Sequence, residues 1–160
     1  MTRITSGTGQ LEYNLNMLRP IARYAPYLAW IIALLSVGIS LYFSDIRGFV
    51  PCNLCWYARI MMYPLVVIIG VGILRRERQL VAYAAPLVAA GWLLELYHTL
   101  LQWGILPETL TRCVATVPCT TKYVNYFGFI TIPFLGLLAF SAIAVNLYLF
   151  WYFGTRPKTV

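Results

Sequence analysis

The sequence predicts an all-α membrane protein built as a bundle of four transmembrane helices. Of its 160 residues, 61% are hydrophobic and only 11% are charged, which is too apolar for an ordinary soluble domain. The apolar residues gather in four runs of about 20 residues, the length that an α-helix needs to cross a bilayer. No repeat, low-complexity tract or polar linker divides the chain, so we expect one compact domain.

The apolar runs define the predicted helices. They cover residues 24–43, 54–74, 80–101 and 126–152. Residues 1–23 are polar to mixed and lack the order of a cleaved signal peptide, so we interpret them as a cytoplasmic leader. Residues 24–152 then form the membrane domain, and residues 153–160 form a cytoplasmic C-terminal tail.

The basic residues predict how the bundle is oriented. Seven of them flank one side of the predicted helices: Arg19, Arg23, Arg75, Arg76, Arg78, Arg156 and Lys158. Three others, Arg47, Arg112 and Lys122, lie in the two loops on the opposite side. Because cytoplasmic loops carry the excess of Lys and Arg, we expect both termini to be cytoplasmic. This signal also explains the net charge of +7 better than nucleic-acid binding does, since no basic stripe with stacking aromatic residues is present.

All four cysteines fall in the two outer loops. Cys52 and Cys55 form a C-x-x-C motif at the start of the second helix, and Cys113 and Cys119 lie in the third loop. A C-x-x-C disulfide closes a very small loop and constrains the unfolded chain little. This favours a redox role, in which the disulfide opens and closes, over a purely structural one. Arg59 lies one turn beyond Cys55 on the same helical face, where a cation favours a thiolate or an anionic partner.

Simpler interpretations exist for each of these features. Either cysteine pair alone is compatible with a structural disulfide, and Arg59 is compatible with an interfacial arginine whose stem lies in the membrane. Two pairs on one side of a small bundle, however, favour a relay. Thiol–disulfide exchange proceeds by thiolate attack through a mixed disulfide, so a loop pair could connect a protein partner with the pair at the membrane.

A relay that makes disulfides needs a final electron acceptor. No G-x-G-x-x-G motif follows a strand, which argues against a dinucleotide site, and a single histidine excludes bis-histidine haem. A membrane quinone needs only a groove with a cation and aromatic side chains. The residues that offer these groups beside Cys55 are Trp56, Tyr57, Arg59 and Tyr63.

Glu95 and His98 are spaced i, i+3 on the third predicted helix. This spacing is half of a di-iron carboxylate motif, but the matching halves are missing, so we predict no metal. His98 lies toward the outer end of its helix, where a proton donor to a reduced quinone would be useful; a hydrogen-bonded packing histidine is an equally good interpretation. We expect Glu95 to face the bundle interior or to pair with a basic group, and we assign it no catalytic role.

Two segments carry a resemblance to a known family. FVPCNLCWYARIMMYPL (residues 49–65) and CVATVPCTTKYVNYFGFITIPFL (residues 113–135), in a four-helix layout, resemble the DsbB family of thiol:quinone oxidoreductases, most closely its BdbC-type branch. The similarity spans about residues 24–152.

The resemblance implies a bacterial plasma-membrane enzyme that forms disulfide bonds on the extracytoplasmic side. A secreted or membrane-anchored thioredoxin-like thiol oxidase (DsbA/BdbD-like) would pass electrons to Cys113 and Cys119, which pass them to Cys52 and Cys55. Membrane quinone, either menaquinone or ubiquinone, would then reoxidise the second pair.

The resemblance also implies roles for single residues. Cys113 would form the mixed disulfide with the partner, and Cys55 would lie against the quinone. Arg59 would be the quinone-binding arginine, and His98 falls near a histidine of the family.

Two other functions remain open at this point. One is a vitamin K epoxide reductase-like enzyme, although in that family the loop pair precedes the C-x-x-C motif and here the order is reversed. The other is a non-enzymatic tetraspan scaffold with two structural disulfides, which should resist mild reductants that open an exchanging pair.

Overall fold

The fold is helical and contains four helices that are long and apolar enough to cross a membrane. The computed structural model describes residues 6–77, 79–107, 118–124 and 129–154, with side chains from residue 22 onward. Its elements are α1 (Ser6–Leu41), the π-helix η1 (Tyr42–Ile46), α2 (Asn53–Arg75), α3 (Leu80–Gln102), α4 (Ile132–Leu149) and the π-helix η3 (Phe150–Gly154). The candidate spans are Ala22–Ile46, Asn53–Arg75, Leu80–Gln102 and Ile132–Phe153. The predicted all-α class and the presence of four long apolar helices are therefore confirmed for the described residues.

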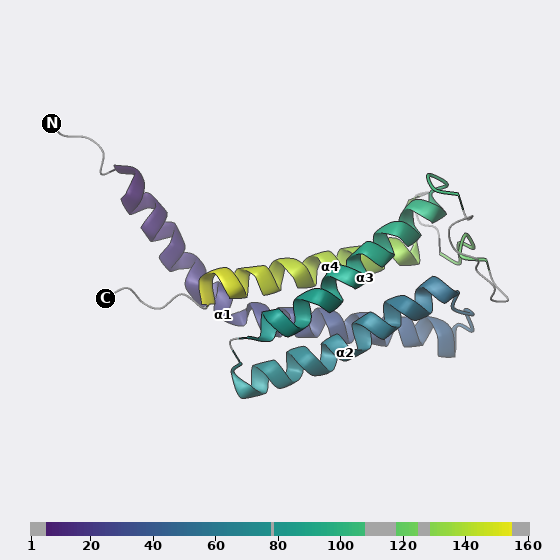
Figure 1. The fold of residues 1–160 in the computed structure, drawn as a ribbon, viewed down its shortest axis with the longest axis horizontal. Helices are drawn as coiled ribbons and strands as arrows, with labels where there is room; N and C mark the ends of the chain where they lie inside the picture. Colours follow the sequence, from purple (N-terminus) through teal and green to yellow (C-terminus); the bar gives the residue numbers. More distant parts are fainter. Residues whose placement is uncertain (1–5, 78, 108–117, 125–128, 155–160) are drawn as a thin grey trace.

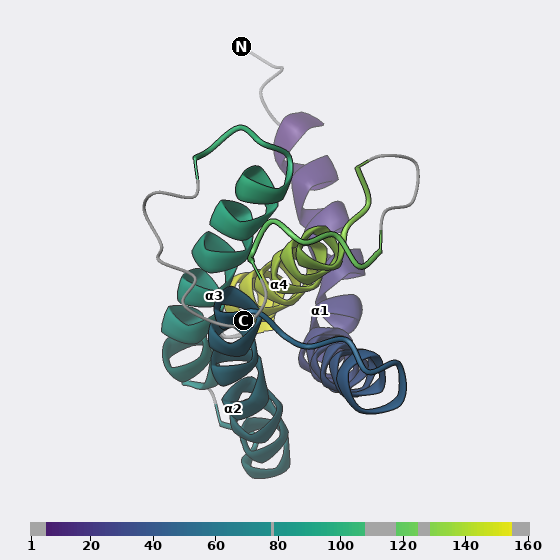
Figure 2. The same ribbon diagram turned by 90° about the vertical axis from the view of Figure 1, so that its right-hand side faces the viewer.

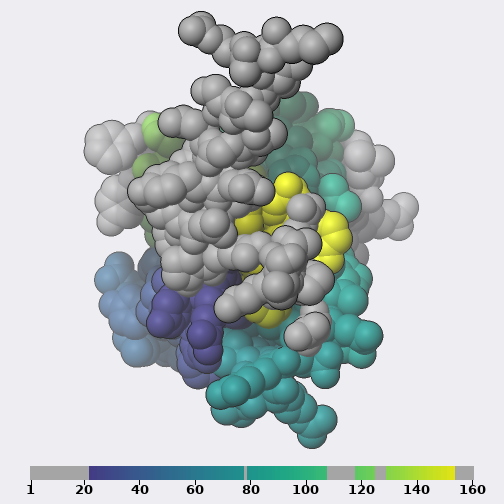
Figure 3. All heavy atoms as spheres, turned by 90° about the vertical axis from the view of Figure 1, so that its left-hand side faces the viewer, coloured from purple at the N-terminus to yellow at the C-terminus, as the bar shows by residue number. Residues whose placement is uncertain are grey.

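The helices form a four-membered bundle in which sequence neighbours run antiparallel. α2 packs against α1 and α3, and α4 packs against the same two helices. The beginning of α1, the end of η3 and the turn between α2 and α3 lie at one end of the bundle (Figure 1), and Figure 3 views that end. The segment that joins α1 to α2 and the described parts of the segment between α3 and α4 lie at the opposite end, which faces the viewer in Figure 2.

The two central helices begin and end within one residue of the predicted bounds. The turn after α2 is closed by Arg76, whose φ of 51° places it in the left-handed region. The backbone N–H of Glu77 donates to the carbonyl of Gly72 at 2.9 Å. A left-handed residue at this position satisfies the last carbonyls of a helix and stops it.

The first and last helices, α1 and α4, have other bounds than predicted. α1 extends back to Ser6, so most of the predicted leader is helical, and it widens into η1, which keeps Ser44 and Asp45 helical rather than in a loop. α4 begins at Ile132 rather than at residue 126. It begins there because Thr131 is extended and Pro133 occupies the first turn, where its missing N–H costs nothing.

Small residues on α1 and α3 allow the helices of the bundle to pack closely. α1 contributes the fully buried Ala29 and Ala33 to the core. On α3, Gly91 lies against Phe140 of α4, and a Cβ at Gly91 would come within 2.3 Å of that ring. The indole N–H of Trp30 donates to the carbonyl of Val66 at 3.0 Å and ties α1 to α2. The core is therefore narrow, and many large apolar side chains point outward, as expected for a lipid-facing surface.

Candidate redox site

Two free thiols lie at the beginning of α2. Cys52 is the N-cap residue, with extended backbone (ψ 171°), and Cys55 lies in the first turn. Their Sγ atoms are 3.1 Å apart, within hydrogen-bond distance, and both residues are reduced. Because the N-cap residue is followed directly by the first helical turn, the C-x-x-C spacing brings the two side chains to the same end of the helix. Cys52 is buried and Cys55 is half-buried.

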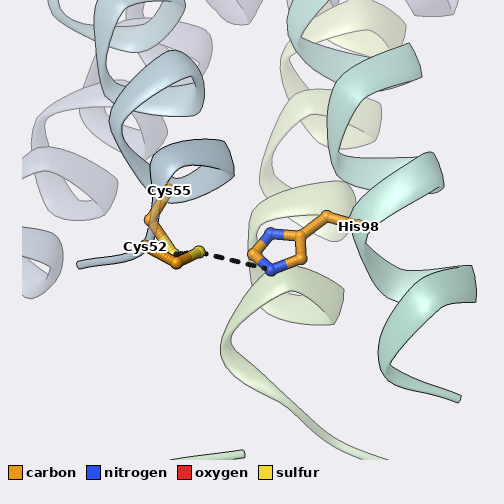
Figure 4. A group of neighbouring side chains, drawn as sticks. All are labelled: Cys52, Cys55 and His98. Carbon is orange, nitrogen blue, oxygen red and sulfur yellow. Dashed lines mark hydrogen bonds between the residues drawn. The ribbon is translucent and has the colours of Figure 1, made fainter. Parts of the chain in front are cut away.

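His98 of α3 reaches across to this pair (Figure 4). Its Nε2 atom lies 3.7 Å from Cys52 Sγ and 3.3 Å from the backbone carbonyl of Cys119. Its Nδ1 atom faces Oε2 of Glu95 at 3.9 Å. Within the described part of the chain, that nitrogen and that oxygen are buried and have no hydrogen-bond partner. His98 therefore lies between Cys52, at the beginning of α2, and Glu95, which precedes His98 by one turn on α3.

Glu95 faces the bundle interior, as one of the two predicted alternatives states. It is 6% exposed. Gly136 of α4 makes room for it, since a Cβ at that glycine would lie 2.9 Å from the Glu95 carboxyl carbon.

The surroundings of Cys52 favour its thiolate. The S–H of Cys55 donates to the ionised sulfur and lowers the pKa of Cys52 from the ordinary thiol value to about 4. Burial opposes this shift, whereas the hydrogen bond and the charge of His98 reinforce it. The thiolate is the nucleophilic form of cysteine, so Cys52 is prepared for exchange at neutral pH.

The segment between α3 and α4 brings Cys119 to the same site. Cys119 is disulfide-bonded, is almost fully buried and belongs to one apolar cluster with Cys52, Leu54 and Leu101. The side-chain amide of Gln102 donates to the carbonyl of Cys119 at 3.4 Å and to that of Thr121 at 3.1 Å. The other predicted loop cysteine, Cys113, lies outside the described residues.

Arg59 is held by the first helix rather than by the cysteines. Its Nη2 atom donates to the carbonyl of Ser40 and to the hydroxyl of Ser44, both at 3.1 Å. Its guanidinium carbon lies 5.3 Å from the centroid of the Trp56 ring, a cation–π distance. The π-helical end of the first span therefore fixes the position of this cation.

A cavity of about 360 Å³ connects these groups. Its wall is mostly apolar and comes from all four helices and from the α1–α2 and α3–α4 segments. The polar or reactive side chains on the wall include Cys52, Cys55, Arg59, Tyr63, Glu95, His98 and Gln102. Of the residues predicted to receive a quinone, Arg59, Tyr63 and His98 line this cavity. Trp56 does not; it lines a neighbouring, more open groove together with Arg59 and Tyr63.

Two residues that the sequence did not single out hold the α1–α2 and α3–α4 segments in place. One is Gln102, which lies four residues after His98 and therefore on the same face of α3. The other is Tyr123, whose hydroxyl donates to the carbonyl of Val50 at 3.1 Å and whose ring stacks on Phe49 at 4.7 Å. The i, i+4 spacing from His98 could have indicated Gln102, but no pattern in the sequence indicates the contact of Tyr123.

The cysteines and His98 form a group that the sequence analysis did not consider. The sequence argument weighed metal ligation only through Glu95 and His98. In the structure, one ligand atom each from Cys52, Cys55 and His98 lies within 4.8 Å of the other two.

Comparison with known proteins identifies close relatives. The family model described as "Disulfide bond formation protein DsbB" matches residues 22–151. "Disulfide bond formation protein C" of Bacillus subtilis is 44% identical over 119 residues, covering 74% of this chain and 86% of the relative. "Probable disulfide formation protein C 1" of Bacillus anthracis is 41% identical over 122 residues, which cover 76% of this chain and 88% of the relative. A "Probable disulfide formation protein" of Oceanobacillus iheyensis is 43% identical over 122 residues, which cover 74% of this chain and 82% of the relative. No solved structure is significantly similar to the chain.

Proposed function

Because the chain belongs to the DsbB family of disulfide bond formation proteins, we propose that it oxidises an extracytoplasmic thioredoxin-like protein and passes the electrons to membrane quinone. The observation that carries this proposal is the free Cys52–Cys55 pair on the wall of an apolar cavity, in one buried cluster with the disulfide-bonded Cys119. A dithiol beside a disulfide is the arrangement that a two-pair relay requires.

The proposal places both termini in the cytoplasm and the cysteine loops outside the plasma membrane of a bacterial cell. Its support is the excess of Lys and Arg in the sequence before the first span, between the second and third spans and after the fourth span. The cysteines then lie in an oxidising compartment, where disulfide chemistry is sustained.

Electrons enter through the loop pair, Cys113 and Cys119. Cys113 exchanges with the partner, which is a secreted or membrane-anchored thioredoxin-like thiol oxidase, and the loop pair becomes a dithiol. The Cys119 thiolate then attacks Cys52 in an inner disulfide, the Cys52–Cys55 bond breaks, and Cys55 leaves as a thiolate. Attack by Cys113 on Cys119 restores the loop disulfide and releases Cys52. Two electrons thereby move to the inner pair, and the buried position of Cys119 beside Cys52 supports this step.

The released Cys52 thiolate is held by two neighbours. The Cys55 S–H donates to it at the 3.1 Å separation of the sulfurs, and His98 Nε2 lies 3.7 Å away to hold or accept a proton. Glu95 lies behind the imidazole, with its Oε2 atom 3.9 Å from Nδ1. A nucleophile with a base beside it is the arrangement that activates nucleophiles in many enzymes.

The cavity residues fit a quinone ring. The wall is apolar enough for an isoprenoid quinone, and a few polar groups converge on it, as is typical of small-molecule sites. Arg59 and His98 would bind the ring oxygens, Cys55 would face the ring, and Tyr63 would contact it. Trp56 would support Arg59 from the neighbouring groove. Bound menaquinone or ubiquinone would supply a two-electron, two-proton sink for the inner pair.

A reconstituted reaction tests the proposed function. The purified protein is mixed with a reduced thioredoxin-like partner and a quinone, and quinone absorbance is followed. We expect quinone consumption to stop in Cys55→Ser and in Cys113→Ser. Tyr57→Phe should retain it, because the Tyr57 side chain is exposed and, contrary to the sequence-based expectation, lines neither the cavity nor the neighbouring groove. Unchanged consumption in both serine variants would show that the thiols are not the route of the electrons.

A second measurement separates this enzyme from a tetraspan scaffold. Thiols are alkylated before and after a mild reductant, and the modified cysteines are mapped by mass. An exchanging pair opens under mild reductant and becomes labelled, whereas structural bridges stay closed. Resistance of every disulfide would favour the scaffold.

A further inference from the structure

We propose that the reduced Cys52–Cys55 pair and His98 form a binding site for one Zn²⁺ ion, which holds the pair as thiolates and prevents its oxidation. The three ligand atoms lie within 4.8 Å of one another. The two sulfurs are 3.1 Å apart, and Cys52 Sγ lies 3.7 Å from His98 Nε2 (Figure 4). The proposal needs only a reduced pair and does not depend on quinone reduction.

The donor set is one that zinc uses. Two cysteines and one histidine, with a fourth position left to water, form a known class of open zinc site. Zn–S bonds of about 2.3 Å at the tetrahedral angle place two sulfurs about 3.8 Å apart. The distance between Cys52 Sγ and His98 Nε2 is already close to this value. The distance between the two sulfurs would have to increase by about 0.7 Å. All three residues line the cavity, which leaves space for the water.

Glu95 provides the independent observation that points to a metal. A zinc-bound histidine usually donates its other ring N–H to a carboxylate, which fixes the tautomer and orients the ring. Nδ1 of His98 faces Oε2 of Glu95 at 3.9 Å, and neither atom has a hydrogen-bond partner elsewhere in the described part of the chain. Zinc on Nε2 would place the proton on Nδ1 and give both buried atoms a partner.

The binding step moves protons but no electrons. The Cys52 and Cys55 thiols each lose a proton as the two Zn–S bonds form, and zinc keeps its oxidation state. Cysteine binds metal as the thiolate, so a closed Cys52–Cys55 disulfide offers no ligand. Zinc and disulfide formation therefore compete for the same two sulfurs, and zinc outside the cell would arrest the relay in its reduced state.

Cobalt titration of the full-length protein in detergent tests the site. After complete reduction with a phosphine, we expect one Co²⁺ per chain, with a thiolate-to-cobalt charge-transfer band that Zn²⁺ abolishes. Protein with the Cys52–Cys55 disulfide closed should give no band. His98→Ala should weaken binding at least tenfold, and Glu95→Gln should weaken it about tenfold, the lower end of effects of residues behind metal ligands.

The loop cysteines provide the matched control. Complete reduction also frees Cys113 and Cys119, so the double variant Cys113→Ser/Cys119→Ser should keep the cobalt band, whereas Cys52→Ser should lose it. A band that survives Cys52→Ser, or one that requires the loop pair, would place the metal elsewhere and overturn the proposal.

A protection experiment on the unaltered chain avoids variants that fail to fold. The reduced protein is alkylated with and without Zn²⁺, and labelling of Cys52 and Cys55 is quantified by mass. We expect Zn²⁺ to slow labelling of both residues at least tenfold. Equal labelling would refute the zinc site, and if quinone reduction is intact in the same preparation, the proposed function would stand without it.

Discussion

Nε2 of His98 lies 3.7 Å from Sγ of Cys52, although 46 positions separate the two residues in the sequence. The contact joins the C-terminal part of α3 to the N-cap of α2. It also places the only histidine of the chain beside the more buried thiol of the C-x-x-C motif. The chemistry of the inner pair therefore depends on how these two helices pack.

The reactivity of Cys52 should be nearly independent of pH in the neutral range. Because its pKa is lowered to about 4, the thiolate is already the main form above that pH and is lost only as the pH falls through it. We expect the iodoacetamide rate at Cys52, mapped by mass, to stay nearly constant from about pH 6 to 8, whereas an ordinary thiol gains about tenfold per pH unit below its pKa near 8.5. A tenfold rise per unit at Cys52 would contradict the assignment.

His98→Ala should restore part of the ordinary pH dependence. The substitution removes a hydrogen bond and a charge that lower the pKa of Cys52. If the pKa of Cys52 rises above 6, we expect alkylation at pH 6 to slow by up to about tenfold for each further unit of increase. His98→Asn can retain a hydrogen bond but not the charge, so its alkylation rate should fall between the rates of the unaltered protein and of His98→Ala. An unchanged pH profile in both variants would remove His98 from the activation of Cys52.

Arg59→Ala should act on the quinone rather than on the protein partner. The guanidinium is fixed on the cavity wall by hydrogen bonds to Ser40 and Ser44. We expect the apparent KM for quinone to rise about tenfold, equivalent to about 1.4 kcal/mol of binding free energy. Ser44→Ala removes one hydrogen bond to Arg59 and should have a smaller effect. Equal changes in the KM for quinone and for the partner would count against this role.

Gly91→Ala should destabilise the bundle. The added Cβ would come within 2.3 Å of the Phe140 ring, so α3 and α4 would have to separate or the ring would have to move. Overpacking of this kind costs about 1 to 3 kcal/mol, measured here as a lower midpoint of unfolding in detergent. Gly38→Ala is the matched control, since no atom lies within 4 Å of its added Cβ. Phe140→Leu in the Gly91→Ala background should recover part of the loss.

Reporter fusions test the orientation of the bundle. A fluorescent protein fused after Val160 should fluoresce, and alkaline phosphatase fused after Ile105 should be active, because the first reporter works in the cytoplasm and the second outside it. Replacing Arg75, Arg76 and Arg78 with Gln leaves four basic residues on the predicted cytoplasmic side, against three on the opposite side. We expect a mixed population of orientations in that variant. The opposite pattern in the unaltered protein would reverse the assigned sides.

The sequence predicted the helices best where charge marks their ends. The basic group from Arg75 to Arg78 separates two apolar runs, so the end of α2 and the start of α3 fell within one residue of the prediction. Hydropathy does not distinguish helix from coil outside the membrane, and it therefore missed the extension of α1 to Ser6. It also placed the start of α4 too early, because an apolar run precedes Thr131; Pro133 was the signal for the true start.

The candidate site was predicted as a set of residues and not as an arrangement. Spacing along α2 was enough to group Cys52, Cys55 and Arg59. It could not show that Arg59 contacts Ser44, because that contact depends on how η1 packs against α2. The same limit applies to His98, whose partners come from the beginning of α2 and from the segment between α3 and α4.

Cys52 also serves as the N-cap residue of α2, and this position couples electron transfer to helix electrostatics. The positive end of a helix dipole stabilises an anion, and the thiolate of Cys52 supplies one when the pair is reduced. Closing the Cys52–Cys55 disulfide removes that negative charge. If the chain works as the proposed relay, each turnover would add and remove a negative charge at the beginning of α2. The first turn of this helix would then be electrostatically more stable with the pair reduced than with the disulfide closed.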